Sequence, residues 1–140
     1  MTAKSRGFTL IELLVVVAIL GIIAAIGITS YNGYVSSTKK KSTENVLRQI
    51  ALAQTEYYSD NQIYYYNNTG SDCTATVNTS QSIETDLLGG SKTIIDPKNK
   101  KALNGYWICI SNDTSGFKAK AIEENNRSGC KIELFADTRV

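Results

Sequence analysis

The hydrophobic residues of this chain are concentrated near its start. From Leu13 to Ile28 every residue is aliphatic, Ala or Gly, and no charge follows Glu12 until Lys39. At about 1.5 Å per helical residue, a helix over residues 8–29 is long enough to cross a hydrocarbon core of about 30 Å. The pattern therefore predicts a membrane-spanning helix with one carboxylate near its beginning.

The helical pattern continues past this apolar run and becomes amphipathic. An apolar stripe at helical spacing is formed by Val46, Ile50, Ala53 and Tyr57, widened by Leu47 and Ala51. We predict one helix from residue 8 to about residue 59. Such a helix is about 78 Å long, more than a small globular domain can cover. Its exposed half must have another use, and this length favours a role in assembly.

The last quarter of the chain changes to a period of two. Residues 106–110, 117–122 and 130–135 read as three short strands separated by turns. One apolar face of this predicted antiparallel sheet can cover the apolar stripe of the helix. We therefore predict an α+β fold, in which a long N-terminal helix packs on a small β-meander. The segment between helix and sheet is polar and rich in loops.

The residue types of common catalytic and metal sites are scarce. His is absent, and Cys73, Cys109 and Cys130 form no CxxC motif. Gly-rich phosphate loops are also absent. We predict no catalytic residue, no metal, no cofactor and no enzymatic activity. In a domain exported across a membrane, three cysteines are expected to give one disulfide and one leftover thiol.

The N-terminal segment resembles a known processing signal. Lys4, Arg6, Gly7 and Phe8 precede Thr9-Leu10-Ile11-Glu12 and the apolar run, and this order is similar to the class III signal of type IV prepilins. The match to the type IV pilin motif continues almost residue for residue to Ile26, and Tyr31 and Tyr34 match aromatics that usually follow it.

The resemblance implies how the chain is divided and processed. Residues 1–7 would be a leader that a dedicated prepilin peptidase removes between Gly7 and Phe8, followed by N-methylation of Phe8. Residues 8–38 would be the transmembrane and filament-core half of the helix, and residues 39–140 a globular head. Loss of Lys4 and Arg6 leaves 13 basic residues (15 minus 2) against 13 acidic ones, so the charge does not indicate nucleic-acid binding.

The resemblance also implies partners and a location. A buried carboxylate needs a partner, and the terminal amine of a neighbouring Phe8 could pair with Glu12 and set the docking register of the incoming subunit. The expected partners are identical or related pilin subunits, the peptidase and methyltransferase, an inner-membrane assembly platform and, before assembly, the lipid bilayer. The chain would move from the bacterial inner membrane, which it crosses once, into an extracellular pilus used in adhesion, twitching motility or DNA uptake.

Two features depend on how closely the chain follows the family. Some pilins tie the loop after the helix to the last strand, which favours Cys73–Cys130 ahead of Cys109–Cys130 as the disulfide. Many type IV pilins carry a helix-bending proline at the position of Thr29, so this helix is expected to be straighter or to bend at Gly27 instead.

The sequence is also compatible with other functions. The chain could be a pseudopilin of a type II secretion system, or a minor pilin that acts as a tip or DNA-binding module. A patch of Lys98, Lys100, Lys101, Lys118 and Lys120 could bind DNA, although a solvated face is the simpler expectation. A cluster of Tyr57, Tyr58, Tyr64, Tyr65 and Tyr66 is expected to hold the loop after the helix on the head.

Overall fold

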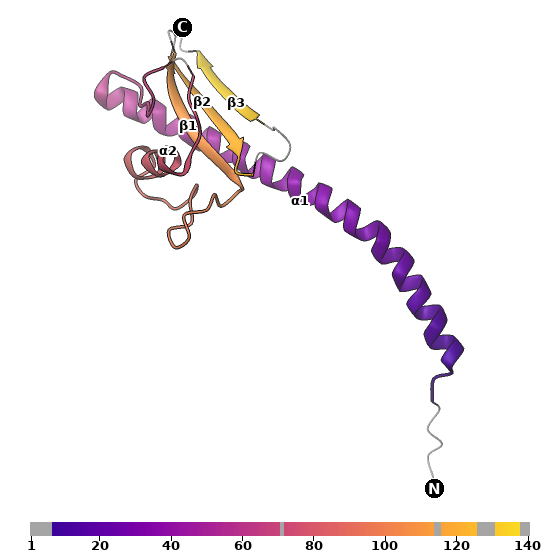
Figure 1. Ribbon diagram of the computed structural model, residues 1–140. Helices are drawn as coiled ribbons and strands as arrows, with labels where there is room; N and C mark the ends of the chain where they lie inside the picture. Colours follow the sequence, from indigo (N-terminus) through magenta and orange to yellow (C-terminus); the bar gives the residue numbers. More distant parts are fainter. Residues whose placement is uncertain (1–6, 71, 114–115, 126–130, 138–140) are drawn as a thin grey trace. The chain divides into compact units, whose positions relative to one another are not determined.

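The computed structural model describes residues 7–70, 72–113, 116–125 and 131–137. Its elements are helix α1 (Leu10–Asn61), helix α2 (Val77–Ser82), the π-helical turn η1 (Ile83–Leu87) and strands β1 (Tyr106–Asp113), β2 (Gly116–Glu123) and β3 (Lys131–Asp137) (Figure 1). The chain divides into two compact units, with the boundary between Thr38 and Lys39 inside α1. We describe each unit by itself and call the second one the head.

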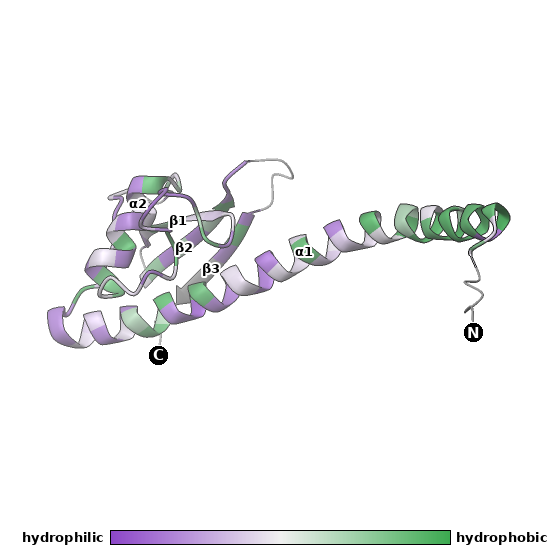
Figure 2. Ribbon diagram, turned by 90° about the horizontal axis from the view of Figure 1, so that it is seen from below, coloured by the Kyte–Doolittle hydropathy of each residue, from purple (hydrophilic) through white to green (hydrophobic). Residues whose placement is uncertain are grey.

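In the first unit, α1 buries almost nothing. Every residue from Gly7 to Tyr34 is exposed, including the long aliphatic side chains. Figure 2 shows the apolar colour running along this part of the helix, whereas the later part is mixed. Within the described residues, α1 is the one helix long and apolar enough to cross a membrane, judged by length and composition.

The head is built on a three-stranded antiparallel sheet in the order β1-β2-β3. Ile108 faces Ala121 and Ile110 faces Ala119 across β1 and β2, and Ala121 in turn faces Ile132 of β3. These positions lie on one face of the sheet because side chains alternate along a strand. The predicted α+β fold with an antiparallel meander is confirmed.

This face and the amphipathic part of α1 share one hydrophobic core. Val46, Leu47 and Ile50 of the predicted stripe are buried there, and Ala53 and Tyr57 are half-buried. The core is completed from the sheet and the intervening segment by Ile83, Ile94, Ile95, Tyr106, Ile108, Ile110, Phe117, Ala119 and Ala121. Burying a large aliphatic side chain contributes about 1.5–3 kcal/mol, so this stripe holds helix and sheet together.

The segment between α1 and the sheet is tied down at several points. Gln54, which is fully buried in α1, donates from Nε2 to the Tyr65 carbonyl (2.7 Å) and accepts from the Tyr65 amide at Oε1 (2.8 Å). Tyr58 stacks on Tyr64, with ring centroids 4.5 Å apart, and Tyr57 meets Tyr65 edge-on. The predicted role of the tyrosines in holding this loop is confirmed for these four rings.

The outer edge of β1 is covered by the same segment. The Ile108 amide donates to Ser80 Oγ (2.8 Å), and the Ile110 amide donates to Asn67 Oδ1 (3.0 Å). The backbone amide of Asn67 donates to the Ile110 carbonyl (3.1 Å). These bonds satisfy strand groups that an open sheet edge would leave unpaired.

The disulfide differs from both predicted pairings. Cys73 is bonded to Cys109, and both are buried. Cys109 lies on the face of β1 opposite Ile108, and the loop carrying Cys73 crosses that face. The prediction that Cys130 pairs with Cys73, or with Cys109, is therefore wrong. Cys130 itself lies outside the described residues.

Candidate functional site

The candidate site is the start of α1, where the predicted processing and assembly residues lie. The Thr9 amide donates to Glu12 Oε2 (2.9 Å), and Thr9 Oγ1 donates to the same oxygen (2.7 Å). The Glu12 amide in turn approaches Thr9 Oγ1 (3.4 Å). Thr9 and Glu12 thus form a capping box, which satisfies amide groups that a helix leaves free at its N-terminus.

The cap gives Glu12 a local partner that the sequence analysis did not identify. The signal was present, because a Thr followed three residues later by Glu, just before an apolar run, is the usual signature of a helix start. The carboxylate also lies at the positive end of the helix dipole. Thr9 therefore orients the Glu12 side chain as well as beginning the helix.

Neutral hydrogen bonds do not cancel the charge of Glu12. Among the described residues, none of the ion pairs includes Glu12. A carboxylate in an apolar environment is costly unless a cation accompanies it. The oriented carboxylate can thus accept a cation from outside the described part of the chain.

Gly7 and Phe8 precede the helix, and the described part of the chain does not pack around them. A Cβ placed on Gly7 would meet no heavy atom of the described structure within 4 Å. The Phe8 side chain is 86% exposed. Folding of this chain therefore does not require the small residue before the large aromatic one, which is the pattern expected if another protein recognises them.

Gly21, Gly27 and Gly33 show the same independence from the chain's own packing. A Cβ at any of the three would meet nothing within 4 Å among the described residues, and α1 continues through all of them. Glycine costs about 1 kcal/mol relative to alanine in a helix interior. Small residues on an exposed apolar helix are typical of surfaces where another helix approaches closely.

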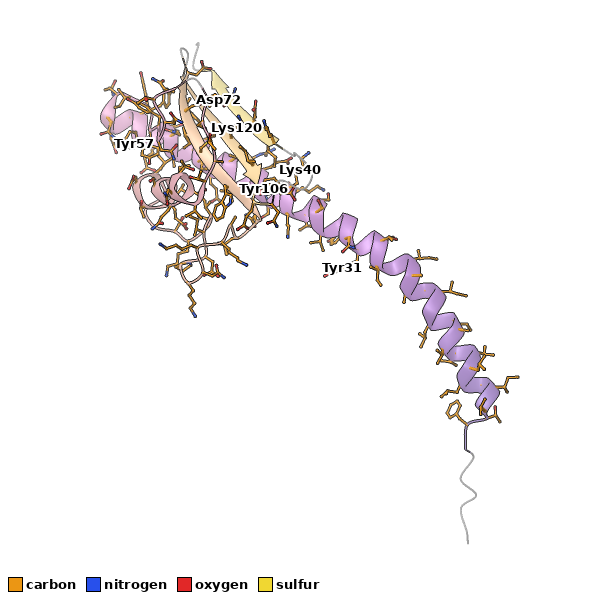
Figure 3. The ribbon with its side chains drawn as sticks, in the orientation of Figure 1. Tyr31, Lys40, Tyr57, Asp72, Tyr106 and Lys120 are labelled. Atoms are coloured by element: carbon orange, nitrogen blue, oxygen red, sulfur yellow. A yellow bond between two sulfur atoms is a disulfide. The ribbon has the colours of Figure 1, made fainter. Side chains whose placement is uncertain are left out.

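The lysines proposed as a DNA-binding patch are not all available. Lys120 is only 6% exposed, and its Nζ lies 2.8 Å from Asp72 Oδ1 and 3.8 Å from Glu133 Oε1. Figure 3 shows Asp72 and Lys120 side by side over the sheet. Lys118 Nζ lies 3.8 Å from Glu133 Oε2. These two cations are engaged with carboxylates, whereas Lys98, Lys100 and Lys101 are exposed.

Two titratable groups of the head are shifted by their surroundings. The hydrogen bond from Lys120 lowers the pKa of Asp72, and the Cys73 amide acts in the same direction. Burial raises the pKa of Tyr65, and the negative charge of Asp86 adds to this. Both groups fix the segment between α1 and the sheet. In the described part of the chain, no group of three His, Cys, Asp or Glu could hold a metal ion.

Comparisons with known proteins converge on one family. Residues 2–28 match the family model described as the prokaryotic N-terminal methylation motif. A fimbrial protein of Neisseria meningitidis is 30% identical over an alignment of 148 positions, gaps included. The alignment covers 99% of this chain and 86% of that protein. The match extends well beyond the N-terminal motif.

Two other relatives match over only part of their length. Fimbrial protein EcpC of Eikenella corrodens is 41% identical over 73 residues, which cover 52% of this chain and 48% of that protein. The type IV major pilin protein PilA of Myxococcus xanthus is 39% identical over 61 residues, which cover 44% and 28%. The matched regions thus span less than half of these two relatives. No solved structure matches the chain.

Proposed function

Since this chain belongs to the type IV pilin family, whose members are structural and non-enzymatic, we propose that it is a structural subunit of a type IV pilus. Residues 1–7 are a leader that prepilin peptidase removes before Phe8 is methylated. The helix up to residue 38 anchors the subunit in the inner membrane and later forms the filament core. Residues 39–140 are the head of the subunit.

The observation that carries this proposal is the exposed apolar part of α1. Residues 7–34 bury none of their side chains in this chain, and exposed apolar surface of this extent needs lipid or other helices around it. A helix in a bilayer and then in a bundle of like helices satisfies this requirement in both states. The head needs no such partner because it has its own core.

Glu12 selects how subunits meet. Thr9 orients its carboxylate, and the amine of a neighbouring processed Phe8 is the cation most available to it in a staggered bundle. Pairing the two groups cancels a charge that is costly in apolar surroundings. A mismatch in register leaves both charges unpaired, so the pair favours one docking position.

Mass spectrometry of filaments sheared from cells tests the proposal. We expect a chain that begins at methylated Phe8, contains 133 residues (140 minus 7) and is lighter by two hydrogens because of one disulfide. Recovery of the intact precursor from filaments would refute it.

The alternatives are separated by abundance and location. The names of the relatives, which are fimbrial proteins and major pilins, favour a main pilus subunit. A pseudopilin of type II secretion would be absent from sheared extracellular material, and a minor pilin at a tip would be present at a small fraction of the filament mass.

A further inference from the structure

A cavity of about 200 Å³ lies in the head between η1 and the loop that follows it. Glu84 of η1 is buried at this cavity, whereas Lys92 and Lys100 line it and are exposed. Ile95 and Pro97 provide apolar surface. The lysines thus mark the mouth of the cavity and Glu84 its floor.

Glu84 carries an unmatched acceptor. Its Oε2 accepts from the Ile95 amide (3.1 Å), but Oε1 has no hydrogen-bond partner among the described residues. The residue is only 7% exposed. A buried carboxylate oxygen without a donor is costly, and such groups are rare unless a ligand or another group completes them. Moreover, Glu84 lies in a π-helical turn, an element frequent at functional sites.

The two lysines stand in an unusual backbone conformation. Lys92 and Lys100 have φ values of 55° and 54°, and among the described residues only Gln62 is a further non-glycine residue with positive φ. Positive φ is uncommon for lysine, and the surrounding structure must enforce it. The loop therefore places both ammonium-bearing side chains at the cavity at some energetic cost.

The charges indicate the kind of ligand. The lysines would repel a simple cation, and Glu84 together with Asp96, which also lines the cavity, would repel a simple anion. A metal ion does not fit either, since no group of three suitable ligands exists among the described residues. The complementary ligand carries one positive and one negative group close together.

We propose that this cavity binds a free aliphatic α-amino acid. The ammonium group lies at the acidic residues that line the cavity, Glu84 and Asp96, the carboxylate lies between Lys92 and Lys100, and the side chain contacts Ile95 and Pro97. This site is separate from the N-terminal assembly segment, and the proposal does not depend on the role of the chain in a filament.

A matched set of three ligands tests it on the full-length chain in detergent micelles. L-Valine carries both charges, isobutylamine lacks the carboxylate, and isovalerate lacks the ammonium group. Binding is followed by NMR through the Ile95 amide, which donates to Glu84. We expect valine to bind and each single-charge analogue to bind about tenfold more weakly or worse, as loss of one charged hydrogen bond implies. Equal binding of valine and isobutylamine, or no binding of valine, overturns the proposal.

Variants locate the binding. Glu84→Gln and Lys100→Gln should each weaken valine binding about tenfold or more. Lys101→Gln, an exposed neighbour that does not line the cavity, should leave it unchanged. If Glu84→Gln fails to fold, the ligand series and the Lys100→Gln variant still test the proposed site. Equal losses in Lys100→Gln and Lys101→Gln would show a general charge effect and overturn the assignment.

Discussion

At the scale of single residues, Glu12 combines two tasks that one substitution can separate. The Thr9 amide and hydroxyl hold its carboxylate at the first turn of α1. In Glu12→Gln, the amide oxygen can still accept from Thr9, but the charge is gone. We expect normal membrane insertion and a helical subunit, with the yield of sheared filaments reduced about tenfold or more.

Thr9→Val is the matched comparison for this prediction. It removes the hydroxyl of the cap and leaves the carboxylate charge in place, which should cost about 1 kcal/mol at the helix start. Filament yield should fall less than in Glu12→Gln. Equal losses in the two variants would mean that the capping box, rather than the charge of Glu12, is what assembly requires.

The Asp72–Lys120 pair makes the stability of the head depend on pH. The pKa of Asp72 is lowered by Lys120, so the folded state favours the ionised carboxylate more than the unfolded chain does. Its contribution is fully present above the unfolded value of about 3.9 and is lost as the pH falls through the lowered folded value. Asp72→Asn should therefore lower stability at pH 7 by more than it does at pH 2.

Thermal unfolding of the chain in micelles at these two pH values measures this difference. Asp60→Asn is the control because Asp60 is exposed near the end of α1. An Asp72→Asn chain that loses as much stability at pH 2 as at pH 7 would contradict an electrostatic origin.

At the scale of elements, Gln54 joins α1 to the loop that follows it. Its side-chain amide makes two hydrogen bonds to the backbone of Tyr65. Gln54→Ala removes both and leaves the Tyr65 amide and carbonyl without them, which should lower the free energy of unfolding by about 2–3 kcal/mol. Gln49→Ala, on the exposed side of the same helix, should change it by less than about 0.5 kcal/mol. Chemical denaturation in micelles measures both, and equal effects would argue against the clamp.

The Cys73–Cys109 disulfide fixes the same loop on the opposite face of the sheet. Reducing the bond or introducing Cys109→Ser should lower the free energy of unfolding by about 2–4 kcal/mol. Peptide mapping should recover Cys73 linked to Cys109 in the native chain and in Cys130→Ser. Loss of the crosslink in Cys130→Ser would show that the pairing is different.

The apolar stripe of α1 could be predicted from the sequence, whereas the Gln54 contact and the disulfide could not. Val46, Leu47 and Ile50 follow a local period, so the buried side of the helix could be assigned from spacing alone. Gln54 continues that spacing, four residues after Ile50, but it is polar, and its burial depends on two hydrogen bonds to the backbone of Tyr65. The cysteine pairing depends on the path of the loop across the far face of the sheet, which no local pattern encodes.

The site at the start of α1 could likewise be predicted only in part. The resemblance to prepilins drew attention to Gly7, Phe8 and Glu12, and the match to the methylation motif covers them. The role of Thr9 is encoded in its spacing from Glu12, but a charge in an apolar run points first to a partner on another chain. The cavity at Glu84 could not be predicted, since it depends on a π-helical turn and on two lysines with positive φ.

At the scale of the whole molecule, the two units have different requirements. The head encloses a core of its own, whereas the first unit exposes an apolar helix interrupted by Gly21, Gly27 and Gly33. Nothing in the described chain fills the space beside these glycines. In an isolated subunit, replacing one by alanine should therefore stabilise the helix by about 1 kcal/mol. In a filament, the added methyl group would clash with a neighbouring helix that packs closely against this position.

Gly27→Ala distinguishes these two effects in one protein. We expect helix content in micelles, measured by circular dichroism, to equal or exceed that of the wild type. Filaments of this variant should form in lower yield or dissociate at lower detergent concentration, because close approach of helices at small residues is lost. Ala24→Gly is the reciprocal control, since it weakens the helix without adding volume. If Gly27→Ala filaments were as abundant and as stable as wild type, Gly27 would be neither a packing position nor a weak point in the helix that assembly uses.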